Sequence, residues 1–378
     1  MKKITIGQLC KPNVGQIKLD DDRLIDYFDI ASIDNINKKI TGFTTYTFVE
    51  APSRARRMIK KDNILVSTIR PNLNAVALFD MNTQNVPVAS TGFCVLDCKE
   101  DTNPRFLFYY LQSRFFVNEM VSQATGASYP AVSDKIVRSA HIPVYSYDEQ
   151  VVIADMLDKV TYIIAKRKQQ LAKLDELVKA RFVEMFASIS NKVNMEDVCK
   201  IITDGTHQPP KFTTEGIPFL FVSNIITNKI CYDAEKFITE EVYTELVKRT
   251  PIEMGDVLLS TVGSYGHPAV VKSERPFCFQ RHIAYLKPDR DRINSEYLHS
   301  AILSDEVQRQ IDERVKGIAQ KTLNLSEIRK LQFPLPSIEK QNQFAAFVGQ
   351  IDKSKISIKK SIEQMEILKR ALMQQYFE

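Results

Sequence analysis

The acidic and basic residues of the sequence contain one arrangement that could carry catalytic chemistry. Asp80 is followed by Asp97-Cys98-Lys99, which loosely matches the Asp…(Asp/Glu)-x-Lys pattern that binds Mg²⁺ and positions water in nucleases. No proline precedes Asp80, and Asp289-Arg290 in the second half does not repeat the pattern. We therefore interpret Asp97 as a turn acid beside a lysine and keep a nuclease as the alternative.

Other catalytic signatures are absent from the sequence. No glycine is followed by lysine, which excludes a P-loop, and no Gly-x-Gly-x-x-Gly or Asn/Asp-Pro-Pro-aromatic motif occurs. The five histidines form no metal-binding pair at helical spacing. Among the six cysteines the only close pair, Cys94 and Cys98, lacks the second pair that a zinc site needs. We expect a chain without catalytic site, metal or cofactor, with reduced thiols.

Basic and amide side chains of the first half could contact DNA. Three arginines precede a predicted strand, and an Arg-Pro-Asn-Leu-Asn segment occupies a predicted turn between strands. Arginine can read guanine edges and asparagine can read adenine, although a solvated face and an ordinary turn are the alternatives. The DNA contacts expected in this half are Arg54, Arg56, Arg57, Arg70, Asn72, Asn74, Ser128 and Tyr129.

The second half offers a rigid polar loop at residues 204–211 and two short polar groups farther along the chain. Ser128-Tyr129 and Gln320-Lys321, which follow Gly126 and Gly317, differ between the halves. They are favoured as backbone or base contacts because they immediately precede a segment that the two halves share. The DNA contacts expected in the second half are Thr206, His207, Gln208, Lys211, Ser264, Tyr265, His267, Arg281, His282, Gln320 and Lys321.

The elements that must position these residues are written twice in the chain. Gln150 and Gln341 each begin a long helical stretch, and these two stretches are similar at a constant spacing of 191 residues. The globular regions before them are much less alike. This combination favours the same task on two different ligands, with drift after duplication as the alternative. We expect globular regions at 1–149 and 187–340, and helices at 150–186 and 341–378.

Each globular region is predicted to contain strands and helices. Residues 64–77 and 257–271 are rich in β-branched residues around a turn, which predicts two strand pairs. Residues 103–116 and 294–307 have helical apolar spacing, with Asn103 and Asn294 as N-caps. The predicted fold class is α+β, with two similar domains, a pseudo-two-fold internal repeat and two long helices.

Each long helix spans about 37 residues, or roughly 55 Å at 1.5 Å per residue, and Ser146 to Glu149 form a capping box before the first. The fully apolar row is at heptad position a in the first helix and at d in the second. Antiparallel pairing brings these rows together and keeps Lys355 and Lys369 out of them. We expect an intramolecular antiparallel coiled coil, with independent solvent-exposed helices as the alternative. Its core is predicted at Leu157, Ile164, Leu171, Val178, Ile351, Ile358, Met365 and Leu372.

The bulk composition is that of a globular protein with no membrane segment. The chain has 378 residues, 26% of them charged, and a net charge of +5, which permits a nucleic acid partner without requiring one. No stretch approaches the roughly 20 apolar residues that span a membrane, and no apolar segment near the start suits a signal peptide. We expect a cytoplasmic protein.

Taken together, these segments resemble the specificity subunit of type I restriction–modification systems over essentially the whole chain. The resemblance implies two target recognition domains that each read part of a bipartite DNA site, spaced by the coiled coil. It also implies two modification subunits that methylate adenine with S-adenosylmethionine, and ATP- and Mg²⁺-dependent restriction subunits. An architectural DNA binder is a further alternative. The first half has no Asp-Gly-Thr-His loop and differs from the second half at residues 127–132. The resemblance therefore assigns DNA contacts less directly in residues 1–149. The resemblance rests on residues 204–207, 280–284 and 320–325 and on the helix starts ending at Gln150 and Gln341.

Overall fold

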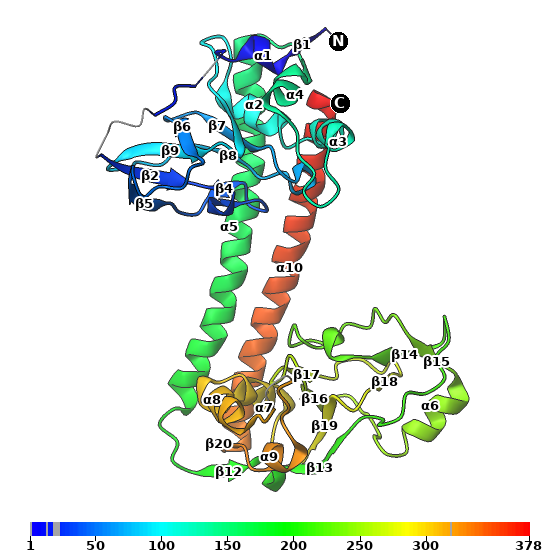
Figure 1. Ribbon diagram of the computed structural model, residues 1–378. Helices are drawn as coiled ribbons and strands as arrows, with labels where there is room; N and C mark the ends of the chain where they lie inside the picture. The colour runs from blue at the N-terminus through cyan, green and yellow to red at the C-terminus, as the bar shows by residue number, and fades with distance from the viewer. Residues whose placement is uncertain (1, 13, 18–22, 318–319) are drawn as a thin grey trace. The chain divides into compact units, whose positions relative to one another are not determined.

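The computed structural model describes residues 2–12, 14–17, 23–317 and 320–378, which form two compact units. Unit 1 comprises Met1–Lys168 and Lys359–Glu378, and unit 2 comprises Gln169–Ile358. Both units contain part of each of the two longest helices, α5 (Tyr147–Phe186) and α10 (Ile338–Phe377) (Figure 1). Each unit mixes helices and strands, which agrees with the predicted α+β class.

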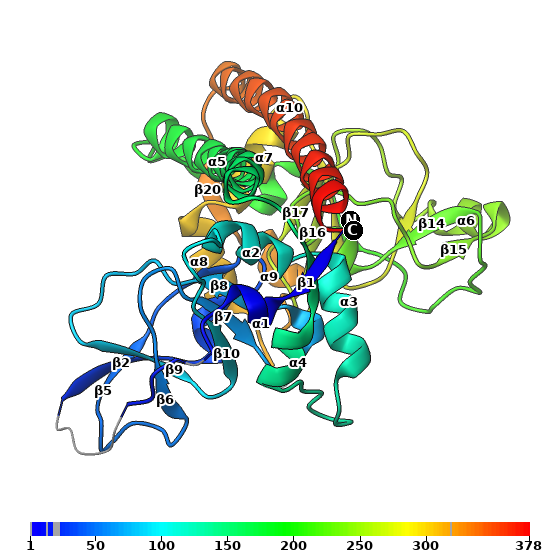
Figure 2. The ribbon, with the colours of Figure 1, turned by 90° about the horizontal axis from the view of Figure 1, so that it is seen from above.

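Unit 1 is built on two sheets that separate its residues into two lobes. One sheet has the order β5-β2-β9-β6 and the other the order β10-β7-β8. The first sheet lies apart from α3 in both views (Figures 1 and 2). The strands are β1 (Lys3–Thr5), β2 (Leu24–Phe28), β3 (Ile33–Asp34), β4 (Lys39–Ile40), β5 (Thr44–Thr47), β6 (Ala55–Met58), β7 (Ile64–Ser67), β8 (Val76–Leu78), β9 (Val86–Ser90), β10 (Phe93–Leu96) and β11 (His141–Pro143). The helices are α1 (Ile6–Leu9), α2 (Pro104–Tyr110), α3 (Arg114–Gln123) and α4 (Asp134–Ser139), with 3₁₀ turns η1 (Ile30–Ser32) and η2 (Pro71–Leu73).

Unit 2 also has two larger sheets, but corresponding sheets of the two units have different numbers of strands. Its sheets have the orders β13-β19-β16-β17 and β15-β14-β18, and β14, β15 and α6 lie apart from α8 in Figures 1 and 2. The strands are β12 (Lys192–Asn194), β13 (Cys199–Asp204), β14 (Ile217–Leu220), β15 (Phe237–Ile238), β16 (Val257–Ser260), β17 (Pro268–Val270), β18 (Cys278–Phe279), β19 (Ile283–Pro288) and β20 (Gln332–Pro334). The helices are α6 (Glu240–Leu246), α7 (Ser295–Ile302), α8 (Asp305–Arg314) and α9 (Leu325–Arg329), with 3₁₀ turns η3 (Met195–Asp197) and η4 (Val222–Asn224).

The two predicted strand pairs are confirmed, whereas each predicted short helix is in fact two helices. β7 pairs antiparallel with β8, and β16 pairs antiparallel with β17. The helix predicted from Asn103 ends at Tyr110, and a second helix begins after Ser113, whose side chain caps the backbone N–H of Phe116. Unit 2 repeats this break at Ser304. A serine that can cap a new helix therefore outweighs the continuous apolar spacing.

The long helices are antiparallel within each unit, as predicted. In unit 1, Lys168 of α5 lies 3.4 Å from Glu366 of α10, and Phe377 packs in the same core as Leu157. In unit 2, Lys355 of α10 donates to Asp175 of α5 at 2.5 Å. The predicted interface residues are buried or half-buried: Leu157, Ile164, Leu171, Val178, Ile351, Ile358, Met365 and Leu372.

A buried glutamine connects the first turn of each long helix to a neighbouring short helix. α5 begins at Tyr147 rather than Gln150, and α10 begins at Ile338 rather than Gln341, because the capping groups precede both glutamines. Ser146 and Glu149 form the predicted capping box. The Gln150 side chain accepts the Asn103 N–H at 2.9 Å, and the Gln341 side chain accepts the Asn294 N–H at 2.8 Å. The same side chain type therefore joins α5 to α2 and α10 to α7.

Gly349 of α10 provides a test of helix stability. It is an exposed residue inside the helix, and a Cβ built there meets no heavy atom within 4 Å. Gly349→Ala is expected to raise the free energy of unfolding by about 0.5–1 kcal/mol, because alanine loses less backbone entropy than glycine. Chemical denaturation measures the change. A lower free energy of unfolding in the variant would contradict this prediction.

Asp256 is a fully buried carboxylate at the start of β16, where unit 1 has the neutral Asn63. Each side chain accepts a backbone N–H three residues earlier, from Glu253 or Lys60. Burial raises the pKa of Asp256, although the Tyr285 hydroxyl opposes the shift. The folded protein therefore binds a proton at the Asp256 carboxylate more tightly than the unfolded chain does. The free energy of unfolding thus falls as pH rises above the unfolded pKa of about 3.9.

Asp256→Asn is expected to leave the free energy of unfolding unchanged at pH 7 or to raise it by about 1 kcal/mol. The difference from the unmodified chain should shrink below about pH 4, where the aspartate is neutral in both states. Denaturation at several pH values measures it. Asp289→Asn is the matched control with the opposite sign, because Lys200 lowers the pKa of Asp289. A variant that loses stability at neutral pH would contradict the prediction.

Among the described residues, no helix is both long enough and apolar enough to cross a membrane.

Candidate nucleic-acid interface

Two of the predicted DNA-contacting segments of unit 2 lie side by side. The loop after β13 passes the turn before β19: the Gly205 N–H donates to the Ile283 carbonyl at 3.2 Å, and the Arg281 N–H donates to the Thr206 carbonyl at 3.0 Å. A Cβ at Gly205 would lie 2.2 Å from the Phe279 carbonyl oxygen. Glycine is therefore required for this close approach.

The other two segments of unit 2 join the same edge of the sheet. The Thr261 N–H donates to the His282 carbonyl at 2.9 Å, and the Gly263 N–H donates to the Lys321 carbonyl at 3.1 Å. The turn between β16 and β17 thus lies between the 280–282 turn and the 320–321 loop. The structure therefore brings together four polar segments that are far apart in the sequence.

Unit 1 has part of this ladder of backbone hydrogen bonds, with different side chains. The Thr68 N–H donates to the Gly92 carbonyl at 2.9 Å, as the Thr261 N–H does to the His282 carbonyl, and the Arg54 carbonyl before β6 accepts the Thr91 N–H at 2.9 Å. The Arg70 N–H donates to the Pro130 carbonyl at 2.7 Å, in the manner of Gly263 and Lys321. Arg70 and Gly263 are therefore structural counterparts. The arginine cluster and the Asp-Gly-Thr-His loop are not, because the cluster lies on and just before β6, which is antiparallel to β9, whereas the loop follows β13 and bridges Gln280 in parallel.

The predicted contacts of unit 1 differ in how far the fold already uses them. Arg57 is half-buried in an ion pair with Asp134 at 2.5 Å, and the Arg56 guanidinium lies 5.4 Å from the centre of the Phe48 ring. The Asn74 side chain donates to the Leu111 carbonyl and accepts from the Lys38 amine. The exposed residues are Arg54, Arg70, Asn72, Ser128 and Tyr129.

In unit 2 the polar loop of residues 204–211 is fixed by contacts of Asp204 with two basic side chains. Asp204 lies 3.0 Å from His207 and 2.5 Å from Arg249, and the Thr206 hydroxyl donates to the Gln208 carbonyl. Tyr265 donates to Asp312, and His267 contacts Asn228 at 3.1 Å. The exposed side chains are His207, Gln208, Lys211, Ser264, Arg281, Gln320 and Lys321, whereas Thr206, Tyr265, His267 and His282 are half-buried.

Arg249 is a positioning residue that the sequence analysis missed. Its guanidinium donates to Asp204 and also lies 3.4 Å from the Thr203 hydroxyl, which fixes the end of β13. No sequence motif marks this arginine, because only the fold brings it to the loop.

His282 lies in the 280–282 turn. Partial burial and the Arg281 charge both lower the pKa of His282, which favours the neutral imidazole at neutral pH.

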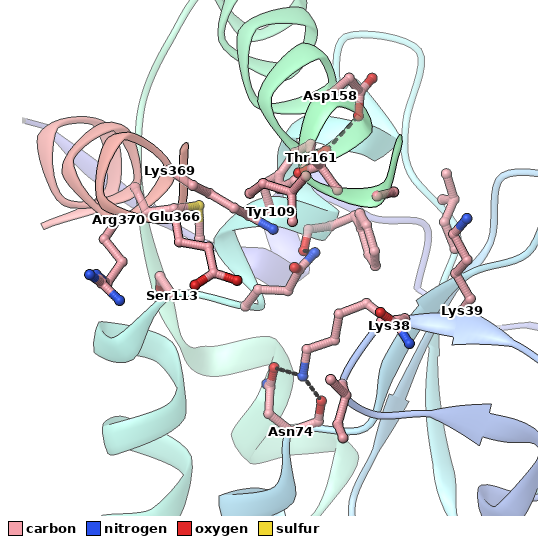
Figure 3. A pocket seen from close by; sticks show the side chains of 18 of the residues that line it. Lys38, Lys39, Asn74, Tyr109, Ser113, Asp158, Thr161, Glu366, Lys369 and Arg370 are labelled. Carbon is pink, nitrogen blue, oxygen red and sulfur yellow. Dashed lines mark hydrogen bonds between the residues drawn. The ribbon is translucent and has the colours of Figure 1, made fainter. Parts of the chain in front are cut away.

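A groove of about 1490 Å³ also lies within unit 1, lined by residues of β4, α2, α5 and α10 (Figure 3). Lys38 extends across it and donates to the backbone carbonyl and side chain of Asn74 (2.5 and 2.8 Å), which ties the β3–β4 hairpin to η2. Burial, followed by repulsion from Lys369, lowers the pKa of Lys38 to about 8. Tyr109 donates to Asp158 at 2.6 Å on the opposite wall. These two sets of hydrogen bonds therefore join elements that line the groove: the β3–β4 hairpin to η2, and α2 to α5.

The residues of the nuclease-like pattern have structural partners. Asp97 lies 2.8 Å from Lys60 and 3.5 Å from Lys11, and the Lys99 amine donates to the Gln8 carbonyl. In unit 2, Lys200, the counterpart of Lys11, forms an ion pair with Asp289 at 3.0 Å. Asp97 and Lys99 therefore both make contacts within the unit. The described part of the chain contains no group of three or more His, Cys, Asp or Glu side chains placed to hold a metal ion.

Comparison with known proteins identifies relatives over both halves. The family model described as type I restriction modification DNA specificity domain matches residues 2–176 and 190–367. The chain is 22% identical over 302 residues to the type I restriction enzyme EcoBI specificity subunit of Escherichia coli, covering 71% of this chain and 63% of that subunit. It is also 22% identical to the MjaVIII specificity subunit of Methanocaldococcus jannaschii, covering 71% and 68% of the two chains. The chain thus spans less than two thirds of the EcoBI subunit.

Solved structures share the fold. One similar chain comes from a study of complex assembly and conformational transition of the type I R-M system; the TM-score is 0.65 and the identity 22%, and the match covers 99% of this chain and 97% of the other. Another is the type I restriction–modification S subunit from M. genitalium, with a TM-score of 0.60, 15% identity, and coverage of 100% and 96%.

Proposed function

Because the chain belongs to the family of type I restriction–modification DNA specificity domains, we propose that it reads a bipartite DNA sequence through two recognition domains. The observation that carries this proposal is a pair of backbone hydrogen bonds shared by the two units, at Thr68 and Thr261 and at Arg70 and Gly263, beside which each unit exposes different side chains. A shared backbone with different side chains suits two readers of different base sequences, since side chains that reach base edges specify the sequence.

We propose that the chain has no catalytic activity of its own and directs partner subunits. These would be two modification subunits that methylate adenine with bound S-adenosylmethionine, and restriction subunits that use ATP and Mg²⁺. The internal engagement of Asp97 and Lys99 supports this assignment of the chemistry to the partners. A cytoplasmic location follows from the proposal, since the DNA target and these cofactors are there.

We also propose how the chain is divided. Residues 1–149 and 187–340 would be the target recognition domains, and the helices of 150–186 and 341–378 would form the coiled coil that separates the two half-sites. The antiparallel contacts within each unit support the coiled coil. The exposed polar residues at the two ladders would then face the two half-sites.

Methylome sequencing tests the proposed function. A strain that carries the gene together with its modification subunit should show one bipartite adenine-methylation motif that a strain lacking this gene does not show. Restoring the gene should restore the motif. An unchanged set of motifs after deletion, with the modification subunit still expressed, would contradict the proposal.

A further inference from the structure

Arg70 and Gly263 occupy the same place in the two units. Ile69 and Val262, which precede them, form equivalent antiparallel bridges with Ala131 and Thr322. Both residues have a left-handed backbone, with φ of 51° at Arg70 and 71° at Gly263. The unit 2 position is therefore filled by the residue that tolerates this conformation, and the unit 1 position by one that does not.

The arginine at this position is held in an exposed and defined arrangement. Its guanidinium lies 4.9 Å from the centre of the Tyr129 ring, and Tyr129 is 69% exposed. Within the described part of the chain, no carboxylate forms an ion pair with Arg70. A Cβ at the counterpart, Gly263, would meet no heavy atom within 4 Å, so a side chain at this position extends into open space.

Non-glycine residues with a left-handed backbone persist only where the surroundings determine their conformation, and such residues cluster at functional sites. A left-handed residue stands at this place in both units, but glycine in unit 2 adopts that conformation without strain. The fold therefore does not require an arginine here. The Arg70 guanidinium makes no contact that explains the strain through packing. What the arginine adds is a planar set of N–H donors, set against an aromatic face and directed outward.

We infer that Arg70 is a specificity-determining residue that reads a guanine in the first half-site, with Tyr129 as its positioning residue. This inference rests on the proposed function. A guanidinium can donate two hydrogen bonds to O6 and N7 of guanine, the commonest specific contact in the major groove. Stacking on Tyr129 restricts the plane of the fork, and reading a base edge requires this orientation more than contacting a phosphate does.

The experiment uses Arg70→Gly in the full chain, assembled with its modification subunits, on duplexes that carry the motif found by methylome sequencing. The duplexes are either unchanged or have one G·C pair of the first half-site replaced. The variant should bind the unchanged duplex about 10- to 100-fold more weakly and should no longer distinguish it from one of the replaced duplexes. Recognition of the second half-site and of the spacer should be unchanged.

Two further variants separate base reading from other roles. Arg70→Lys keeps the charge and should not restore discrimination, whereas Tyr129→Phe keeps the ring and should retain it. The melting temperature of Arg70→Gly should equal or exceed that of the unmodified chain, because glycine relieves the left-handed strain.

The inference would be overturned if Arg70→Gly weakened binding to all duplexes equally and reduced the salt dependence by about one phosphate contact. It would also be overturned if discrimination were unchanged. In both cases the bipartite motif would still be methylated, so the proposed function would stand. The absence of any motif that depends on the unmodified chain would instead be a failure of the proposed function.

Discussion

Gln341→Ala is expected to lower the free energy of unfolding of unit 2 by about 3 kcal/mol. The Gln341 side chain is completely buried. It accepts the Asn294 N–H at 2.8 Å and donates to the Arg292 and Pro336 carbonyls at 3.1 and 2.9 Å. Alanine would leave one backbone donor and two acceptors without partners, and each such group costs about 1–3 kcal/mol.

Hydrogen-exchange mass spectrometry of the full chain measures this change, because peptides from α7 and β16 report on unit 2 separately from unit 1. Gln343→Ala is the matched control, since Gln343 is exposed two residues farther along the same helix and should have an effect within about 0.5 kcal/mol. Equal protection of α7 in the two variants would contradict the capping role of Gln341.

Gly205→Ala is expected to remove recognition of the second half-site, with a loss of specific DNA affinity of at least about 100-fold. The added Cβ would lie 2.2 Å from the Phe279 carbonyl oxygen and 2.5 Å from that of Gln280. The polar loop must therefore move away from the 280–282 turn. Several base contacts would be misaligned together, and each mismatched position costs about 1–3 kcal/mol.

Binding of the assembled complex to duplexes with and without the second half-site measures this loss. The affinity of the variant for the two duplexes should become nearly equal, while replacement of the first half-site should still weaken binding. Gly349→Ala is the control, because a Cβ there meets nothing within 4 Å. If Gly205→Ala still discriminated at the second half-site, the loop of residues 204–211 would not be part of the reading surface.

The features predicted correctly from the sequence depend on neighbouring residues. Asn103 and Asn294 cap the N-termini of their helices as expected, because the signal is contained in the next three residues. The parallel pairing of β2 with β9 was not predicted. Its strands are about 60 residues apart, and their register depends on which faces become buried rather than on local spacing.

The candidate site shows the same limit at the level of single side chains. Residue type identified Arg57 and Asn74 as able to contact DNA, but the fold places Asp134 beside the first and Lys38 and Leu111 beside the second. The sequence shows that a side chain can form hydrogen bonds, but only the structure shows which partner it has. The counterpart relation of Arg70 and Gly263 likewise depends on backbone hydrogen bonds between distant segments, to Pro130 and Lys321.

The composition of unit 1 has a consequence for the order in which the chain matures on the ribosome. Residues 359–378 belong to this unit, and Phe377 is completely buried against Phe106 and Tyr110, with ring centres 5.3 and 5.8 Å apart. Unit 2 is a continuous segment, residues 169–358. At a synthesis rate of 5–20 residues per second, residues 359–378 of unit 1 are completed roughly 10–40 s after residue 168. The part synthesised first is therefore completed last, and its apolar surface stays uncovered while the second half is translated and can fold.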